Sequence, residues 1–193
     1  MTPRGKIALA VGLSLPPAGL LWVALCHALP PIQGDPMAFA LGCSAAALLL
    51  TLALGIEAVA HERLFHASID PLAGADSRRL EVNQRYLRNT LEQAALFVPG
   101  LFLLAHHASD LRVVAATAIV WTLGRWAYWI GYHVDPMWRG IGVFSMGISL
   151  ALLVYGVGVF GHALAGWAGT AALLGPFVLV EIYLFVALRR PAA

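Results

Sequence analysis

Residues 81–93 read Glu-Val-Asn-Gln-Arg-Tyr-Leu-Arg-Asn-Thr-Leu-Glu-Gln, and this polar stretch continues without a break into the apolar segment 94–105. Ionisable side chains at membrane depth are costly, so they usually face the interior of a helix bundle or a water-filled cavity. The stretch therefore predicts a membrane helix whose first half carries a polar site.

The rest of the chain has the composition of an integral membrane protein. Of its 193 residues, 60% are hydrophobic and 11% are charged, and the mean hydropathy is +0.79. A membrane-spanning helix needs about 20 mostly apolar residues, and we find six such segments. The predicted helices cover residues 5–29, 37–60, 80–106, 111–133, 140–163 and 168–188. We expect an all-α integral membrane protein with a single transmembrane domain, residues 1–193, because open backbone cannot be satisfied in lipid.

The basic residues are biased to one face of this expected bundle. If six helices alternate in direction, eleven of the 12 Lys and Arg residues fall on the face that holds both termini, and only Arg112 falls on the other. By the positive-inside rule, the basic face is cytoplasmic. We expect a multi-pass protein of a bacterial inner membrane, with both termini and the site facing the cytoplasm. The sequence has no dense basic run that would grip nucleic-acid phosphates, so nucleic acid is not an expected partner.

The first predicted helix has two interpretations. Arg4 and Lys6 followed by an apolar stretch could form a cleaved signal peptide. The pair Pro16-Pro17 interrupts the apolar stretch, and the cleavage pattern near Cys26 is poor. These features favour a helix that is retained.

A polar stripe lies on the helix predicted at 80–106. Positions i, i+4 and i+7 share one face of an α-helix, and Arg85, Asn89 and Glu92 have this spacing. The stripe presents a cation, an amide and an anion. It is one candidate wall of a binding cleft.

A second stripe lies on the helix predicted at 111–133. Arg125, Tyr128 and Tyr132 stand at i, i+3 and i+7, which is again one face. Arg139 begins the next helix near the cytoplasmic surface, after Pro136 ends this one. We expect the two stripes to share a cleft, with Arg139 at its mouth.

Each of these residues could also have a structural role, because buried charges often pair and tyrosines often anchor helices at the membrane interface. Two matched stripes on separate helices favour a binding site instead. Guanidinium groups bind carboxylates in forked geometry, and Glu92 can receive an ammonium group. The pattern suits a small zwitterionic ligand with several carboxylates.

The segment Arg85-x-x-x-Asn89-x-x-Glu92 resembles the Arg-x-x-x-Asn-x-x-Glu motif of the MAPEG family, the membrane-associated proteins in eicosanoid and glutathione metabolism. Arg125-x-x-Tyr128-x-x-Gly-Tyr132, followed by Arg139, is similar to the third helix of the family and to the arginine that begins its fourth. The resemblance covers roughly residues 37–163. It implies a MAPEG-like four-helix bundle at 37–163, with one additional transmembrane helix in residues 1–36 and another in residues 164–193.

The resemblance also implies a site and an activity. Glutathione would lie between neighbouring subunits of a homotrimer and would serve as co-substrate. The residues that would bind it are Arg85, Asn89, Glu92, Arg125, Tyr128, Tyr132 and Arg63. Arg139 matches the arginine that stabilises the glutathione thiolate and would be the catalytic residue. The implied function is a microsomal glutathione transferase-like transferase or peroxidase that acts on lipophilic electrophiles or hydroperoxides.

The sequence departs from the family pattern at Gln93, where leukotriene-type members have a tyrosine, so eicosanoid chemistry is not implied. One alternative is a non-catalytic scaffold or ligand-binding member of the same family. Another is a membrane di-iron hydroxylase, suggested by His61, His66 and the pair His106-His107. These histidines fall on opposite membrane faces, and His61 and His66 do not share a helix face. We therefore predict no metal site.

Overall fold

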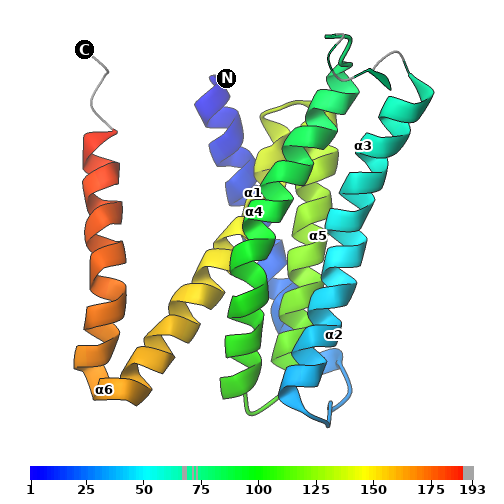
Figure 1. Cartoon of the computed structure of the whole chain (residues 1–193). Coiled ribbons are helices and arrows are strands. Elements are labelled where there is room, and N and C mark those ends of the chain that lie inside the picture. Colours follow the sequence, from blue (N-terminus) through cyan, green and yellow to red (C-terminus); the bar gives the residue numbers. More distant parts are fainter. Residues whose placement is uncertain (67–68, 71, 73, 189–193) are drawn as a thin grey trace.

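The computed structural model describes residues 1–66, 69–70, 72 and 74–188, and the regular structure of these residues is entirely helical (Figure 1). The helices are α1 (Pro3–Ala28), α2 (Pro36–Leu48), α3 (Leu54–Phe65), α4 (Arg78–His107), α5 (Arg112–Val134) and α6 (Phe144–Ala187). A π-helical turn, η1 (Leu49–Ala53), joins α2 to α3, and a 3-10 turn, η3 (Trp138–Gly142), precedes α6. The predicted all-α fold is confirmed.

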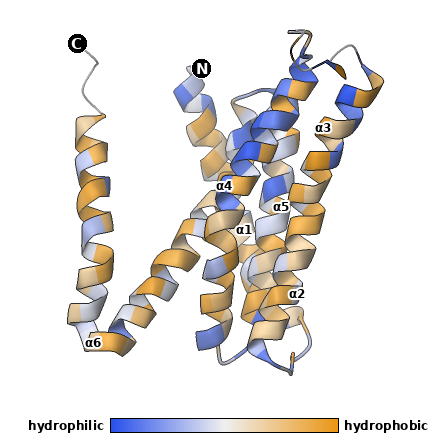
Figure 2. Ribbon diagram, in the orientation of Figure 1, coloured by the Kyte–Doolittle hydropathy of each residue, from blue (hydrophilic) through white to orange (hydrophobic). Residues whose placement is uncertain are grey.

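Within the described residues, four helical stretches are long and apolar enough to span a membrane. They are Pro3–Ala28, Pro36–Phe65, Arg112–Val134 and Trp138–Ala187. Helix α4 has the length but is not apolar enough, and Figure 2 shows hydrophilic residues gathered in its first half. The α3–α4 connection, the N-terminus and the C-terminal end of α6 all lie at the same end of the molecule (Figure 1).

Helix α6 has two arms, residues 144–164 and 167–187, at the places of the helices predicted at 140–163 and 168–188, although the exact arrangement of six helices is not confirmed. It runs as one element of 44 residues, interrupted only where Ala165 and Gly166 leave helical geometry. Gly166 has a φ of +59°, which glycine adopts without strain, and the chain reverses direction there (Figure 1). Only these two residues leave helical geometry, so the two arms of α6 meet in a sharp V (Figure 1).

The helix predicted at 37–60 extends to Phe65 and contains the π turn η1. A π turn interrupts the regular hydrogen-bond ladder of the helix. Two carbonyl groups of η1 accept side-chain donors: that of Leu50 accepts the Trp126 indole N–H at 2.6 Å, and that of Thr51 accepts the Tyr86 hydroxyl at 3.3 Å. The turn thereby attaches α2 and α3 to α4 and α5.

Aromatic stacking and small residues hold α4, α5 and α6 together. The rings of Phe97 and Trp121 are stacked with centroids 4.1 Å apart, and the Trp121 indole donates to the Ser149 hydroxyl at 2.8 Å. Gly142 lies against the backbone of α5, since a Cβ placed there would be 2.2 Å from the Gly124 carbonyl oxygen. These contacts bring the start of α6 to within side-chain reach of the middle of α5.

Helix α1 is packed along η3 and α5. Near its start, Lys6 pairs with Asp135 at 3.4 Å and Ala10 touches Gly140 closely. Near its end, the Trp22 indole donates to the Thr117 hydroxyl at 2.9 Å. These contacts make α1 part of the helix bundle.

We predict that Gly142→Ala destabilises the bundle and that Gly147→Ala does not. The added methyl of the first variant would lie 2.2 Å and 2.3 Å from backbone atoms of Gly124 and Tyr128, which cannot move aside alone. Overpacking of this kind costs about 1–3 kcal/mol. The space around Gly147 is open. Thermal unfolding of both variants in detergent checks this, and equal melting temperatures would contradict the close approach of α5 and α6.

A pH-dependent prediction concerns Asp135, which lies just beyond the end of α5. The backbone N–H of Met137 donates to this carboxylate at 2.7 Å and, together with Lys6, lowers the pKa of Asp135 below its ordinary value. A lowered pKa means that Asp135 stabilises the fold above its ordinary pKa, and that this contribution is lost as the pH falls through the lowered value. Melting curves of wild type and Asp135→Asn should therefore differ at neutral pH and converge in acid. A constant difference at all pH values would argue against this role.

Candidate functional site

Arg125 lies at the centre of the polar region and is fully buried. One Nη atom of its guanidinium donates to the Asn89 amide oxygen at 2.9 Å and to the Thr90 hydroxyl at 3.0 Å, both on α4. The other Nη atom lies 3.5 Å from the Ser145 hydroxyl on α6. Arg125 thus links three helices through one side chain.

Two tyrosine rings cover the same guanidinium. Its Cζ atom is 4.6 Å from the centroid of the Tyr128 ring and 5.6 Å from that of Tyr86, which is the geometry of cation–π contacts. Among the described residues, no carboxylate forms an ion pair with Arg125, and its Nε has no hydrogen-bond partner. The cation is therefore held by neutral groups and retains one unused donor.

Tyr132 connects this centre to two further arginines. Its hydroxyl accepts a hydrogen bond from Arg85 at 3.2 Å, and its ring lies under the Arg139 guanidinium at 5.5 Å. The rings of Tyr132 and Tyr128 meet edge to face with centroids 5.8 Å apart. A continuous chain of contacts therefore runs from Arg139 and Arg85 to Arg125.

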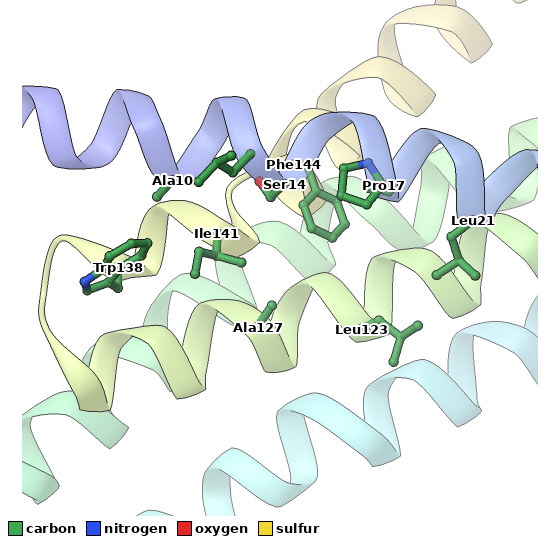
Figure 3. A pocket seen from close by; sticks show the side chains of 11 residues that line it. Ala10, Ser14, Pro17, Leu21, Leu123, Ala127, Trp138, Ile141 and Phe144 are labelled. Atoms are coloured by element: carbon green, nitrogen blue, oxygen red, sulfur yellow. The ribbon is translucent and has the colours of Figure 1, made fainter.

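The turn η3 positions Arg139. The guanidinium donates to the Pro136 carbonyl at 2.8 Å, which directs it back toward the end of α5. Trp138 and Ile141, on either side in the same turn, instead line an apolar pocket of about 330 Å³ between α1 and α5 (Figure 3). Arg139 thus belongs to the polar cluster and not to the apolar pocket.

The structure brings together six of the eight residues that the sequence predicted for the site. They are Arg85, Asn89, Arg125, Tyr128, Tyr132 and Arg139. We call this set the arginine–tyrosine cluster. Glu92 lies on the outer face of α4, exposed, and is close enough to Tyr128 to interact with it electrostatically.

Arg63 is placed differently from the other seven. It lies near the end of α3 and pairs with Asp76 at 3.8 Å, in the connection that leads to α4. None of its described contacts joins it to the cluster. As a ligand-binding residue, Arg63 stays a prediction.

Several residues around the cluster were missed by the sequence analysis. Thr90 and Ser145 hold Arg125 directly, and Tyr86 covers it. Thr90 and Tyr86 stand within the polar stretch 81–93, so their helical spacing from one another could have indicated a shared face. Ser145 carried no such signal, because small residues are frequent along the start of α6.

Gln93 is buried, and its amide oxygen has no hydrogen-bond partner within the described part of the chain. It lies one helical turn beyond Asn89, on the side of α4 that faces the bundle. The position that departs from the family pattern is thus an internal one. It does not lie on the exposed stripe with Arg85 and Glu92.

Two of the histidines that suggested a metal site, His61 and His66, pair with other side chains of their own region. His61 lies 3.7 Å from Glu57, and His66 lies 3.8 Å from Glu62 and 2.7 Å from a guanidinium nitrogen of Arg79. In the residues that the structure describes, no three His, Cys, Asp or Glu side chains are grouped so that they could hold a metal ion. The geometry therefore offers no support for the di-iron alternative.

Comparison with known proteins gives the family. Residues 40–159, well over half of the chain, match the MAPEG family model. The uncharacterized protein sll1147 of Synechocystis sp. is 41% identical over 76 residues, which are 38% of this chain and 55% of that protein, so the match spans only about half of the relative. No solved structure matches the chain. On the extent of the family match, the chain belongs to the MAPEG family of membrane proteins.

Proposed function

We propose that this protein is a membrane-bound, glutathione-dependent transferase or peroxidase that acts on lipophilic electrophiles or hydroperoxides. The observation that carries the proposal is the arginine–tyrosine cluster, in which the two motifs on α4 and α5 meet through Arg125 and Asn89. Membership of the MAPEG family supports a site of this kind in a membrane context.

The charges of the cluster match those of glutathione. The tripeptide carries two carboxylates and one ammonium group, and the cluster offers the guanidiniums of Arg85 and Arg139 beside the carboxylate of Glu92. Arginine binds carboxylates through paired N–H donors, and a carboxylate receives an ammonium group in turn. Tyr128 and Tyr132 supply phenolic groups between these charges. Arg85 and Glu92 are exposed in the single chain, so a ligand could reach them.

Arg139 is the proposed catalytic residue. The thiolate of glutathione, and not the thiol, is the strong nucleophile, and a permanent cation nearby stabilises the thiolate. The thiol proton leaves to solvent, the sulfur forms a bond to the electrophilic carbon, and the leaving group departs with the bonding electrons. In the peroxidase reaction, the thiolate sulfur attacks the terminal hydroperoxide oxygen and the O–O bond breaks; the departing alkoxide takes a proton from solvent and leaves as the alcohol. The thiol of a second glutathione then reduces the sulfenic acid, which gives the disulfide and water.

The assembly and orientation belong to the same proposal. The exposed polar stripe on α4 supports a homotrimer in which glutathione is enclosed between neighbouring subunits. The two arms of α6 together with α1, the continuous α2–α3 span, α4 and α5 would then give six membrane crossings, with both termini and the cluster on the cytoplasmic side of a bacterial inner membrane. Lipophilic acceptors would approach the sulfur from the bilayer.

A binding experiment tests the ligand. Isothermal titration of the purified protein in detergent should show glutathione binding at millimolar concentration or below. Glu92→Gln and Arg85→Ala should each weaken binding roughly tenfold or more, since a hydrogen bond to a charged group contributes about 1.5–3 kcal/mol. Glu57→Gln is the matched control, because Glu57 is exposed and its ion pair among the described residues is with His61, outside the cluster. Absence of binding by the wild type at millimolar glutathione would refute the proposal.

A second experiment separates binding from catalysis. Arg139→Ala should leave glutathione affinity within a few-fold of wild type but reduce the thiolate signal in ultraviolet difference spectra, because the cation that stabilises the thiolate is gone. Arg139→Lys keeps a positive charge and should retain part of the signal. If Arg139→Ala leaves the thiolate signal unchanged, Arg139 is not the thiolate-stabilising residue.

A further inference from the structure

An apolar groove runs along α1, between this helix and the helices of the core. Its first part is the pocket of about 330 Å³ between α1 and α5 (Figure 3), and its second part is a pocket of about 630 Å³ between α1, α5, α6 and the end of α4. Ala18 of α1 and Phe144 of α6 line both pockets, so the two adjoin. On α1 the lining extends from Ala10 to Trp22, which is about 18 Å along the helix axis.

The groove lies between two points at which α1 is attached to the core. Ala10 touches Gly140 at one end, and the Trp22 indole donates a hydrogen bond to α5 at the other. Between them small residues leave the space unfilled, because a Cβ added at Gly19 of α1 or at Gly147 of α6 would meet no atom within 4 Å. Both glycines are exposed in the single chain, so the groove is accessible from outside the helices.

The lining holds no charged side chain among the described residues, and most of its polar groups are already bonded. The Ser14 hydroxyl donates to the Val11 carbonyl at 3.0 Å. The Thr117 hydroxyl donates to the Val113 carbonyl at 2.7 Å and accepts the Trp22 indole N–H. A polar ligand would lose its hydrogen bonds to water here without gaining new ones, so the groove favours an apolar ligand.

The size of the groove favours a chain over a helix of a neighbouring protein. A stretch of helix about 18 Å long and about 10 Å in diameter displaces roughly 1,400 Å³, which is more than the two pockets provide together. An acyl chain is thinner than a helix and can follow a groove of this length. Lipid also surrounds a membrane protein on all sides, so such a chain is always at hand.

Arg4 lies on α1 beyond the end of the groove at η3. Fourteen residues, close to four helical turns, separate Arg4 from Ala18, so the two stand on the same face of α1. Arg4 precedes Ala10 by about 9 Å along the axis, and none of the ion pairs of the described residues involves it. A basic side chain in this position attracts the phosphate of a lipid head group.

We propose that the groove binds one acyl chain of a membrane phospholipid and that Arg4 contacts the phosphate of the same lipid. Helix α1 forms one wall of this site and lies outside residues 40–159, which match the family model. The site therefore belongs to a helix that this chain adds to the family core. The inference goes beyond the proposed function and does not depend on glutathione binding.

Lipid retention tests the groove. Native mass spectrometry of the wild type, extracted in mild detergent, should show a phospholipid bound to the chain. Gly19→Leu and Gly147→Leu should each reduce the bound phospholipid roughly tenfold, because a leucine at either position overfills the groove from a different helix. Gly42→Leu on α2 is the matched control, since its Cβ also meets no atom within 4 Å and it lines neither pocket. A wild type without phospholipid, or equal retention in the filled and control variants, overturns the proposal.

Photolabelling locates the bound chain. Phosphatidylglycerol with a photoreactive diazirine in the middle of one acyl chain is added to the wild type in detergent, and the labelled residues are mapped by peptide mass spectrometry. We expect labels at residues 10–22 of α1 and 144–155 of α6. Labels confined to other helices overturn the site. Retention of a free fatty acid in place of phospholipid overturns the choice of ligand, and loss of oligomer in Gly147→Leu with no lipid in the wild type assigns the groove to a neighbouring copy instead.

Substitution of Arg4 tests the contact with the head group. Arg4→Gln should lower retention of phosphatidylglycerol roughly fivefold, the contribution of one basic residue near an anionic lipid, and should leave the labelled segments unchanged. Arg4→Lys keeps the charge and should retain the lipid. Equal retention by wild type and Arg4→Gln overturns the phosphate contact.

Discussion

The burial of the Arg125 guanidinium is the constraint on which the rest of the bundle depends. A buried cation is costly unless its donors are satisfied, and no described carboxylate pairs with this one. Its partners are instead Asn89 and Thr90 on α4, Ser145 on α6 and two tyrosine rings. Each of these must lie within a few ångströms of one side chain, so α4, α5 and α6 have little freedom to separate or slide. The polar site and the helix packing are therefore set by the same residue.

Close backbone approach is what makes this arrangement possible. Gly142 lies against the backbone of α5 beside Gly124, so the start of α6 comes near enough for Ser145 to reach Arg125 and for the preceding turn to place Arg139 over Tyr132. On the opposite side of the cluster, Gly55 admits the Tyr86 ring, and the π turn offers the Thr51 carbonyl to its hydroxyl. The aromatic groups around Arg125 are thus fixed from two directions by backbone features.

Helical spacing predicted the helical class of the fold and most of the cluster, because positions on one helix face are determined by the period of the helix alone. It could not predict which neutral groups complete the coordination of Arg125. Ser145 resembles the many small residues of α6 that serve only packing, and Thr90 resembles any threonine in a membrane helix. The sequence analysis also did not predict how sharply the chain reverses at Ala165 and Gly166. This reversal brings Gly161 and Gly169 into close contact. Arg63 was assigned by resemblance, and its pairing with Asp76 depends on the course of the α3–α4 connection.

The polar residues of α4 point in two directions and have different roles. Asn89 and Thr90 face inward and hold Arg125, so they are used by the fold of the single chain. Arg88 and Glu92 face outward, where the described chain offers neither an ion pair nor a hydrogen bond, and Arg85 is anchored only through Tyr132. Charged groups on the outside of a membrane helix raise the energy of the isolated subunit, because lipid cannot solvate them. Apart from the bond of Arg85 to Tyr132, the single chain does not use this outer half, and this is the place where the proposed charged ligand would bind, at Arg85 and Glu92.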